Sequence, residues 1–403
     1  MSVPKLRFKE FNSDWTFKNL SDVSNKPLYG MNSAATDFDG ENKYLRITDI
    51  DEESHRFKFT KLSSPSDVIE EKYILKEGDL LFARTGASVG KSYIYDPDDG
   101  KVVFAGFLIK FGLKESVIPY FIFTQTLSEK FNNWVITNSM RSGQPGINAE
   151  EYSKWQIAFT SKPEQTKITS FLSAVDEKIS QLTQKHELLS QYKQGMMQKL
   201  FSQQIRFKAD DGSEFGEWEN KTLGEVGENI IGLTYSPTDV TNDSTGILVL
   251  RSSNIKEGRL DKSDQVRVNK KIKDKIIIQP NDILICTRNG SQRLIGKSVI
   301  INDDEIMTFG AFMSVYRSDY NRFIAYLMQT PWFFEQVQMN LGARINQITT
   351  GTLNEFTFDF PCLEEQTKIA NFLSAIDQKN EVVAQQIEQA KIWKKGLLQQ
   401  MFV

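Results

Sequence analysis

Hydrophobic residues recur at alternating intervals of four and three along residues 164–201, which is the pattern of a helix in a coiled coil. The pattern returns 201 residues later, along 365–402, and about 17 of the 38 positions are identical with no gap. Unrelated amphipathic helices do not share so many residues, so the chain is a tandem duplication. About 38 residues at 1.5 Å each predict two rods of roughly 57 Å, and each narrow apolar stripe predicts packing against the other rod.

The predicted seam between the two helices is mostly apolar and contains a few polar residues. The seam residues that define it are Leu172, Ile179, His186 and Lys193 in the first copy and Leu373, Asn380, Ile387 and Lys394 in the second. We interpret His186 and Asn380 as residues that set the register of pairing rather than as ligands. A globular region separates the helices and must return the chain, so we expect antiparallel packing. Replacing Lys193 and Lys394 with leucine is expected to strengthen the pairing and loosen its register.

Ahead of each helix, the hydrophobic pattern changes to short β-type runs punctuated by Gly, Asn and Asp. The runs cover 44–50, 78–86, 91–96 and 101–111 in the first copy and 247–255, 281–290, 296–302 and 307–316 in the second. Aromatic-rich helical patterns follow at 118–136 and 321–340, and then polar loops. We expect a mixed α/β (α+β) fold with two tandem globular domains, at 1–160 and 203–361, each followed by a long helix, at 161–202 and 362–403. The two helices are expected to form an antiparallel coiled coil.

Similar apolar segments lead into both globular regions. One runs from Leu6-Arg7-Phe8 to Trp15, and the other runs from Ile205-Arg206-Phe207 to Trp218. We interpret them as hydrophobic anchors. We interpret other residues shared by the two copies, among them the pairs Asp79/Asp282 and Phe107/Phe312, as scaffolding.

Composition is ordinary for a soluble globular protein: 39% hydrophobic and 25% charged residues, with a net charge of −3. The N-terminal segment is charged and lacks the apolar stretch of a secretory signal, so we expect a cytoplasmic protein. Two cysteines and two histidines, without metal-ligand spacing, argue against a structural metal site. Each globular region has more acidic than basic residues, so a DNA-binding surface would have to be a local patch.

Motifs for catalysis fail on spacing. Gly-Lys-Ser occurs at 90–92 and at 296–298, but a P-loop needs Gly-x-x-x-x-Gly-Lys, and the preceding glycines Gly86 and Gly290 are one residue too close and one too far. The segment 97–101 brings two aspartates and a lysine together, and we interpret it as a turn. There is no methyltransferase-type (Asp/Asn)-Pro-Pro-(Tyr/Phe) stretch. The chain is therefore predicted to be non-catalytic.

Clustered Arg, Asn, Gln, Ser and Lys side chains in corresponding loops are candidates for DNA contacts, because Arg, Asn and Gln can read guanine and adenine edges in the major groove. Solvated surface loops are the alternative interpretation. A basic run at 269–275 could instead hold the phosphate backbone. The candidates are Arg46, Arg84, Ser88, Lys91, Arg141 and Gln144 in the first copy, and Arg251, Asn254, Lys270, Lys271, Arg288, Asn289, Gln292, Arg293, Lys297, Arg344 and Gln347 in the second.

Taken together, these residues resemble the specificity subunits of type I restriction–modification enzymes over essentially the whole chain. The resemblance rests on the two entry segments, on 78–81 and 281–284, on the run Ser142-Gly143-Gln144-Pro145-Gly146-Ile147-Asn148, and on the doubled helix start Glu-Gln-x-Lys-Ile-x-x-Phe-Leu. The second copy departs from the Gly-Gln-Pro pattern, with Gln347-Ile348-Thr349-Thr350-Gly351.

The resemblance implies two target-recognition domains, each of which reads one half of a bipartite double-stranded DNA target, on helices that set the spacer. It also implies two methyltransferase subunits and two restriction subunits as partners. S-adenosylmethionine, ATP and Mg would be bound by those partners, with no cofactor in this chain.

Two other functions are weighed against this one. A non-DNA adaptor built on the coiled coil would lack salt-sensitive, sequence-specific retention on DNA. A self-sufficient nuclease or methyltransferase would need cofactor binding by the isolated chain, for which the sequence offers no site.

Overall fold

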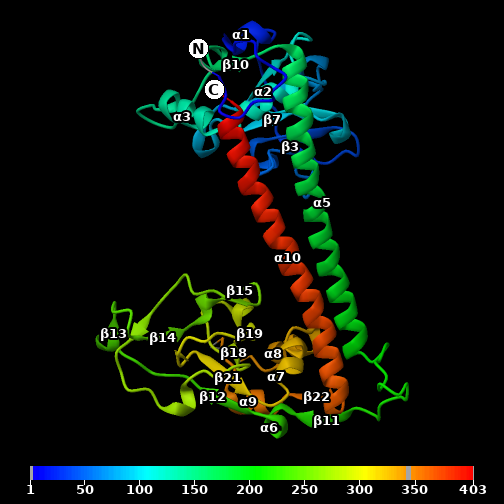
Figure 1. The fold of residues 1–403 in the computed structure, drawn as a ribbon, viewed down its shortest axis with the longest axis vertical. Helices are drawn as coiled ribbons and strands as arrows, with labels where there is room; N and C mark the ends of the chain where they lie inside the picture. Colours follow the sequence, from blue (N-terminus) through cyan, green and yellow to red (C-terminus); the bar gives the residue numbers. More distant parts are fainter. Residues whose placement is uncertain (1–2, 342–345, 403) are drawn as a thin grey trace. The chain divides into compact units, whose positions relative to one another are not determined.

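The computed structural model describes residues 3–341 and 346–402, which fold as a mixed α/β protein (Figure 1). The chain divides into two compact units, one made of Met1–Thr183 with Ala384–Val403 and the other of Gln184–Val383. Each unit therefore contains one globular region and one half of each long helix. The long helices are α5 (Lys162–Phe201) and α10 (Leu363–Met401).

The globular region of the first unit is built around an antiparallel four-stranded sheet in the order β2-β9-β6-β7. Beside it lie the parallel pair β4 and β8 and the antiparallel pairs β1 with β10 and β3 with β5. The elements are β1 (Thr16–Asn19), α1 (Leu20–Val23), β2 (Leu28–Tyr29), β3 (Ala35–Asp37), β4 (Lys43–Leu45), β5 (Ser63–Pro65), β6 (Asp79–Ala83), β7 (Ser92–Ile94), β8 (Val102–Phe104), β9 (Leu108–Gly112), α2 (Pro119–Gln125), α3 (Glu129–Ser139), α4 (Ala149–Ser153) and β10 (Gln156–Phe159).

In the second unit, an antiparallel sheet has the matching order β12-β21-β18-β19, and β14 pairs with β20 in parallel as β4 does with β8. The elements are β11 (Glu219–Thr222), α6 (Leu223–Val226), β12 (Glu228–Ile231), β13 (Val240–Thr241), β14 (Ile247–Leu250), β15 (Ile255–Lys256), β16 (Arg259–Leu260), β17 (Arg267–Val268), β18 (Ile283–Cys286), β19 (Ser298–Ile300), β20 (Met307–Phe309), β21 (Met313–Arg317), α7 (Asn321–Leu327), α8 (Pro331–Met339), α9 (Thr350–Asn354) and β22 (Thr357–Phe360). The duplication seen in the sequence thus extends to strand order and pairing.

In each unit, the first half of one long helix packs against the second half of the other. In the first unit, Ile168 and Leu172 of α5 share a core with Leu397 and Met401 of α10. In the second, Met197 and Leu200 of α5 share a core with the early residues of α10, Ile369, Leu373 and Ile376. The start of each helix meets the end of the other, which confirms the antiparallel pair.

The predicted seam residues differ in how far they are buried. Leu172, Leu373 and Asn380 are buried, and Ile179, His186, Lys193, Ile387 and Lys394 are partly buried. Asn380 donates from Nδ2 to Ser190 Oγ at 3.3 Å across the helix pair. Both lysines pair with an aspartate on the other helix, Lys394 with Asp176 at 2.6 Å and Lys193 with Asp377 at 2.7 Å.

The entry segments contain a polar clamp that the sequence interpretation missed. Arg7 donates two hydrogen bonds to the carboxylate of Glu164, at 2.7 and 2.8 Å, and Trp15 Nε1 donates a third. In the second unit, Arg206 and Trp218 bind Glu365 in the same way. Both carboxylates have 0% exposure, so each entry segment is anchored to the first turn of a long helix by a buried ion pair as well as by apolar packing.

Candidate nucleic-acid interface

In the first unit, the structure brings two candidate loops together. The loop 84–91 follows β6, and the loop 140–148 precedes α4. Thr85 and Gly146 form an antiparallel bridge, Gly86 N donates to Pro145 O at 3.0 Å, and Ile147 N donates to Arg84 O at 2.9 Å. Arg84 and Ser88 therefore lie on a loop bound to the one that carries Arg141 and Gln144.

The second unit repeats this arrangement with different side chains. Arg288 and Gln347 form an antiparallel bridge, and Ile348 N donates to Thr287 O at 2.9 Å. The loop 287–297 after β18 is thereby joined to the loop before α9. Arg344 belongs to the latter loop and lies outside the described residues.

Two arginines at the same place in the two units, Arg84 and Arg288, are not neutralised. Their guanidinium groups make no hydrogen bond or ion pair with any residue that the structure describes. Arg84 lies over the rings of Tyr29 and Phe107, at 5.2 and 5.8 Å from the centroids, and Arg288 lies 4.7 Å from the ring centroid of Phe312. Such cation–π contacts orient a guanidinium without cancelling its charge.

Most other basic candidates are already paired with a carboxylate. Arg46 binds Asp49, Lys91 binds Glu52, Arg141 binds Glu151, Arg251 binds Asp264 and Lys270 binds Asp239. Lys91 is also 93% buried. DNA contacts from these side chains would require breaking or sharing an ion pair, so their charge is less available than that of Arg84 and Arg288.

The amide candidates differ in how far their hydrogen-bonding capacity is used. Asn254 is fully buried, and its Nδ2 donates to Asp261 O and Asp264 O at 2.8 Å, so it holds its loop and cannot reach a base. Asn289 donates to Ser252 Oγ, and Gln292 donates to Gln338 Oε1. Gln144 is exposed next to Gly86. Lys271, Arg293 and Lys297 are exposed basic side chains.

Candidate catalytic features are absent from the described residues. Gly-Lys-Ser leads into strands β7 and β19, whereas a P-loop leads into a helix N-terminus. Burial raises the pKa of the Cys286 thiol to about 11, so it is protonated at neutral pH and is a poor nucleophile. No group of three or more metal-ligating side chains gathers within residues 3–341 and 346–402. Over the same residues, no helix is both long and apolar enough to span a bilayer.

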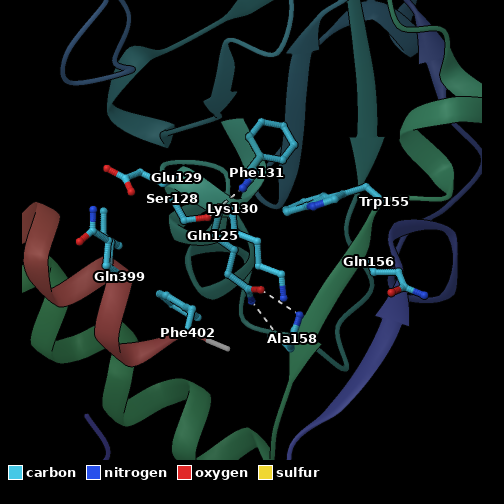
Figure 2. Close-up of a pocket in the computed structure, with 11 residues that line it drawn as sticks. Gln125, Ser128, Glu129, Lys130, Phe131, Trp155, Gln156, Ala158, Gln399 and Phe402 are labelled. Atoms are coloured by element: carbon cyan, nitrogen blue, oxygen red, sulfur yellow. Dashed lines mark hydrogen bonds between the residues drawn. The ribbon is translucent and has the colours of Figure 1, made fainter. Parts of the chain in front are cut away.

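A cavity of about 340 Å³ in the first unit lies among the start of α3, strand β10 and the end of α10 (Figure 2). The amide of Gln125 in this cavity is used internally, because it exchanges two 2.9 Å hydrogen bonds with the backbone of Ala158. None of the lining residues is a DNA candidate, so the cavity is separate from the paired loops.

The sequence interpretation of Phe107 and Phe312 as scaffolding was wrong. Their side chains are 60% and 57% exposed. Each follows a strand of the parallel pair at the same place, and each faces the unpaired arginine. In the sequence, only their matching position in the two copies indicated that these phenylalanines share a role.

Comparison with known proteins agrees with the division of the chain into two similar domains. The family model described as the type I restriction modification DNA specificity domain matches twice, at residues 12–191 and 216–391. The type I restriction enzyme MjaVIII specificity subunit of Methanocaldococcus jannaschii is 23% identical over 97% of this chain and 94% of its own length.

Two solved structures share the fold. The S subunit of a type I restriction–modification system from M. genitalium superposes with a TM-score of 0.61 at 14% identity, over 100% of this chain and 99% of that one. A chain from a structural study of complex assembly and conformational transition of the type I R-M system gives a TM-score of 0.58 at 18% identity, over 96% and 97% of the two chains.

Proposed function

Since this chain belongs to the type I restriction–modification DNA specificity subunits and is a non-catalytic recognition protein with two recognition domains, we propose that each domain reads one half of a bipartite DNA target. The domains are taken as 1–160 and 203–361, on the helices 161–202 and 362–403. The long helices set the unread spacer between the half-sites and dock the partner subunits.

The observation that carries this proposal is the pair of joined loops in each unit, with an unneutralised arginine, Arg84 or Arg288, at the same place in each. Arginine binds guanine O6 and N7 bidentately in the major groove. Next to Arg84 stand Thr85 and Gln144, whereas Asn289 and Gln347 stand next to Arg288. Because the two loop pairs share a backbone arrangement and differ in side chains, the two half-sites should differ in sequence.

The long helices also offer a surface for two copies of one partner. Tyr192 on α5 and Trp393 on α10 are equivalent in the duplication, and each is 51% exposed. Trp393 packs edge-on against Phe171, with ring centroids 6.0 Å apart, so it presents a fixed aromatic surface. Aromatic residues of this kind often anchor protein interfaces. We assign these positions to two methyltransferase subunits, with two restriction subunits joining the full assembly; S-adenosylmethionine, ATP and Mg belong to those partners.

Binding by the chain with its methyltransferase partner tests the reading of DNA. Arg288→Ala should weaken binding to the cognate duplex by about 1–3 kcal/mol and relax one position of one half-site. Replacing Lys270, Lys271 and Lys273 with glutamine should instead weaken binding to cognate and random duplexes alike and reduce the salt dependence. Equal losses on cognate and random DNA for both variants would contradict base reading by Arg288. Retention on DNA that depends on neither salt nor sequence would favour the adaptor function.

A further inference from the structure

Each unit presents one phenylalanine to solvent on a rigid turn next to its unpaired arginine. Phe107 lies in the turn between β8 and β9, and Phe312 lies in the turn between β20 and β21. Full burial of a phenylalanine side chain is favourable by roughly 1.5–3 kcal/mol relative to exposure. A single exposed phenylalanine is unremarkable in a monomer, but two at the same turn of two diverged copies indicate a shared use.

Hydrogen bonds fix both turns. Leu108 N donates to Ala105 O at 2.9 Å and Gly106 N donates to Met31 O at 2.8 Å; in the second unit, Met313 N donates to Gly310 O and Ala311 N donates to Leu233 O, both at 2.9 Å. The backbone approach is so close that a Cβ on Gly30 would lie 2.1 Å from Ala105 O. A Cβ on the equivalent Gly232 would lie 2.3 Å from Gly310 O. Only glycine lets the two backbone segments come this close. The close packing of the segments holds each turn in one place.

The arginine and the phenylalanine of each pair are tied to one another. Arg84 N donates to Phe107 O and Arg288 N donates to Phe312 O, each at 3.0 Å. The guanidinium of each arginine then lies over the ring of the same phenylalanine. Arg84 Nε is buried and has no hydrogen-bond partner among the described residues. This is the geometry of a preorganised pair with unused donors beside an exposed apolar ring.

We propose that Phe107 and Phe312 contact DNA bases directly, and that each forms with its arginine a reader of two adjacent base pairs; this inference rests on the proposed function. The arginine binds guanine O6 and N7, and the ring packs against the C5-methyl group of a thymine on the neighbouring base pair. The thymine methyl is the apolar group that the bases present in the major groove. An exposed ring held beside a guanine-reading arginine is therefore matched to a guanine next to a thymine.

The test uses the complex of this chain with its methyltransferase partner, after the target has been mapped from the methylation pattern of DNA. Each thymine of the target is replaced in turn by deoxyuridine, which removes only the methyl group, and the Kd is measured at fixed salt. One deoxyuridine next to a guanine in each half-site should weaken binding about fourfold, which corresponds to ~0.8 kcal/mol for one buried carbon. Phe107→Ala should weaken binding about tenfold or more and abolish the deoxyuridine effect in one half-site only.

Phe312→Ala should act in the same way on the other half-site, so each variant is the matched control of the other. Phe59 is 52% exposed and has Phe57 and Lys43, not an arginine, at its ring, and Phe59→Ala should leave both deoxyuridine effects unchanged. Specific binding that is insensitive to every deoxyuridine, or half-sites with no thymine beside a guanine, would overturn the phenylalanine contact and leave the proposed function standing. If the unaltered chain with its methyltransferase partner shows no sequence-specific binding to DNA, the proposed function itself is overturned.

Discussion

Glu164 is a carboxylate with 0% exposure at the start of α5, and its charge is retained because three side chains donate to it. Burial by itself would raise the pKa of Glu164, but the hydrogen bonds from Arg7, Thr160 and Trp15 outweigh burial and hold the pKa below its ordinary value of 4.5. Because the folded state binds a proton less readily than the unfolded chain, this carboxylate stabilises the fold above about pH 4.5. The stabilisation is lost as the pH falls through the lower folded-state pKa.

We therefore expect Glu164→Gln to lower the free energy of unfolding most at neutral pH. The difference from the unaltered chain should shrink as the pH falls below about 4.5. Urea unfolding of both proteins across this pH range measures it. The matched control is Glu150→Gln, which removes an exposed pair with Lys154 and should cost less than about 1 kcal/mol at any pH. A difference for Glu164→Gln that does not depend on pH would contradict the assignment.

Individual side chains were the least predictable part of the candidate site. Arg84 and Arg141 look alike in the sequence, since each lies in a polar loop after a regular element. Only the folded chain shows that Arg141 is paired with Glu151 while Arg84 has no acidic partner among the described residues. Partner choice depends on contacts between segments far apart in the sequence, and no local pattern encodes it. The burial of Asn254 was missed for the same reason.

At the level of elements, the lysines of the helix seam belong to matching polar clusters. Asp176 accepts a hydrogen bond from Tyr120 Oη and pairs with Lys394, while Asp377 accepts from Tyr326 Oη at 2.8 Å and pairs with Lys193. Each cluster ties both long helices to one helix of the globular region, α2 or α7. Burial and the neighbouring carboxylates raise the pKa of both tyrosines, so both remain protonated donors.

These clusters change the expected effect of replacing the seam lysines. Lys394→Leu would leave the carboxylate of Asp176 without its ion-pair partner. Because the Asp176 side chain is only 16% exposed, the variant should lower the free energy of unfolding by about 1–3 kcal/mol. Lys193→Leu should cost less, because the side chain of Asp377 is 43% exposed and water can replace the lost partner. Chemical unfolding of the two variants provides the measurement. The double variant Lys394→Leu/Asp176→Asn should recover part of the stability, because the amide oxygen can still accept from Tyr120 Oη and carries no charge. A gain in stability from Lys394→Leu alone would support the seam pattern over the ion pair.

The elements themselves were largely predictable from the sequence. The long helices, the helical segments at 118–136 and 321–340, and the main strands all follow from the change of hydrophobic period. The parallel pairing of β4 with β8 and of β14 with β20 was not predictable. The paired strands are separated by more than fifty residues, and a run of three or four residues does not encode its partner. The two polar loops in each unit are likewise joined by bridges between residues far apart in the sequence, Thr85 with Gly146 and Arg288 with Gln347.

For the whole molecule, the duplication predicts two equivalent docking positions. Trp393→Glu and Tyr192→Glu should each remove one of two methyltransferase copies, because a charge replaces a half-exposed aromatic side chain at one of the two positions. Native mass spectrometry of the complex counts the copies. Val68→Glu is the matched control, since Val68 is 91% exposed on the globular region. Loss of both copies from a single variant, or of neither, would contradict independent docking.

The duplication also assigns the bases of the half-sites and the distance between the half-sites to different parts of the chain. Each unit has its own loop pair, so exchanging residues 24–160 for the matching region of a relative should change one half-site and leave the other unaltered. The helices carry the spacing instead. The boundaries between the two units fall in both long helices, after Thr183 and after Val383, at nearly equivalent positions of the duplication.

Inserting four residues at both boundaries should therefore lengthen the unread spacer without changing the bases read. Four helical residues add about 6 Å, which corresponds to a spacer longer by about one or two base pairs at 3.4 Å each. Both helices need the insertion, because lengthening α5 alone near Gly195 would shift Lys193 out of register with Asp377. Sequencing the methylated DNA of cells that carry each variant measures half-sites and spacer together. If the half-sites change while the spacer stays constant, the length of the helices does not set the distance between the two half-sites. The helices would then affect which bases are read instead.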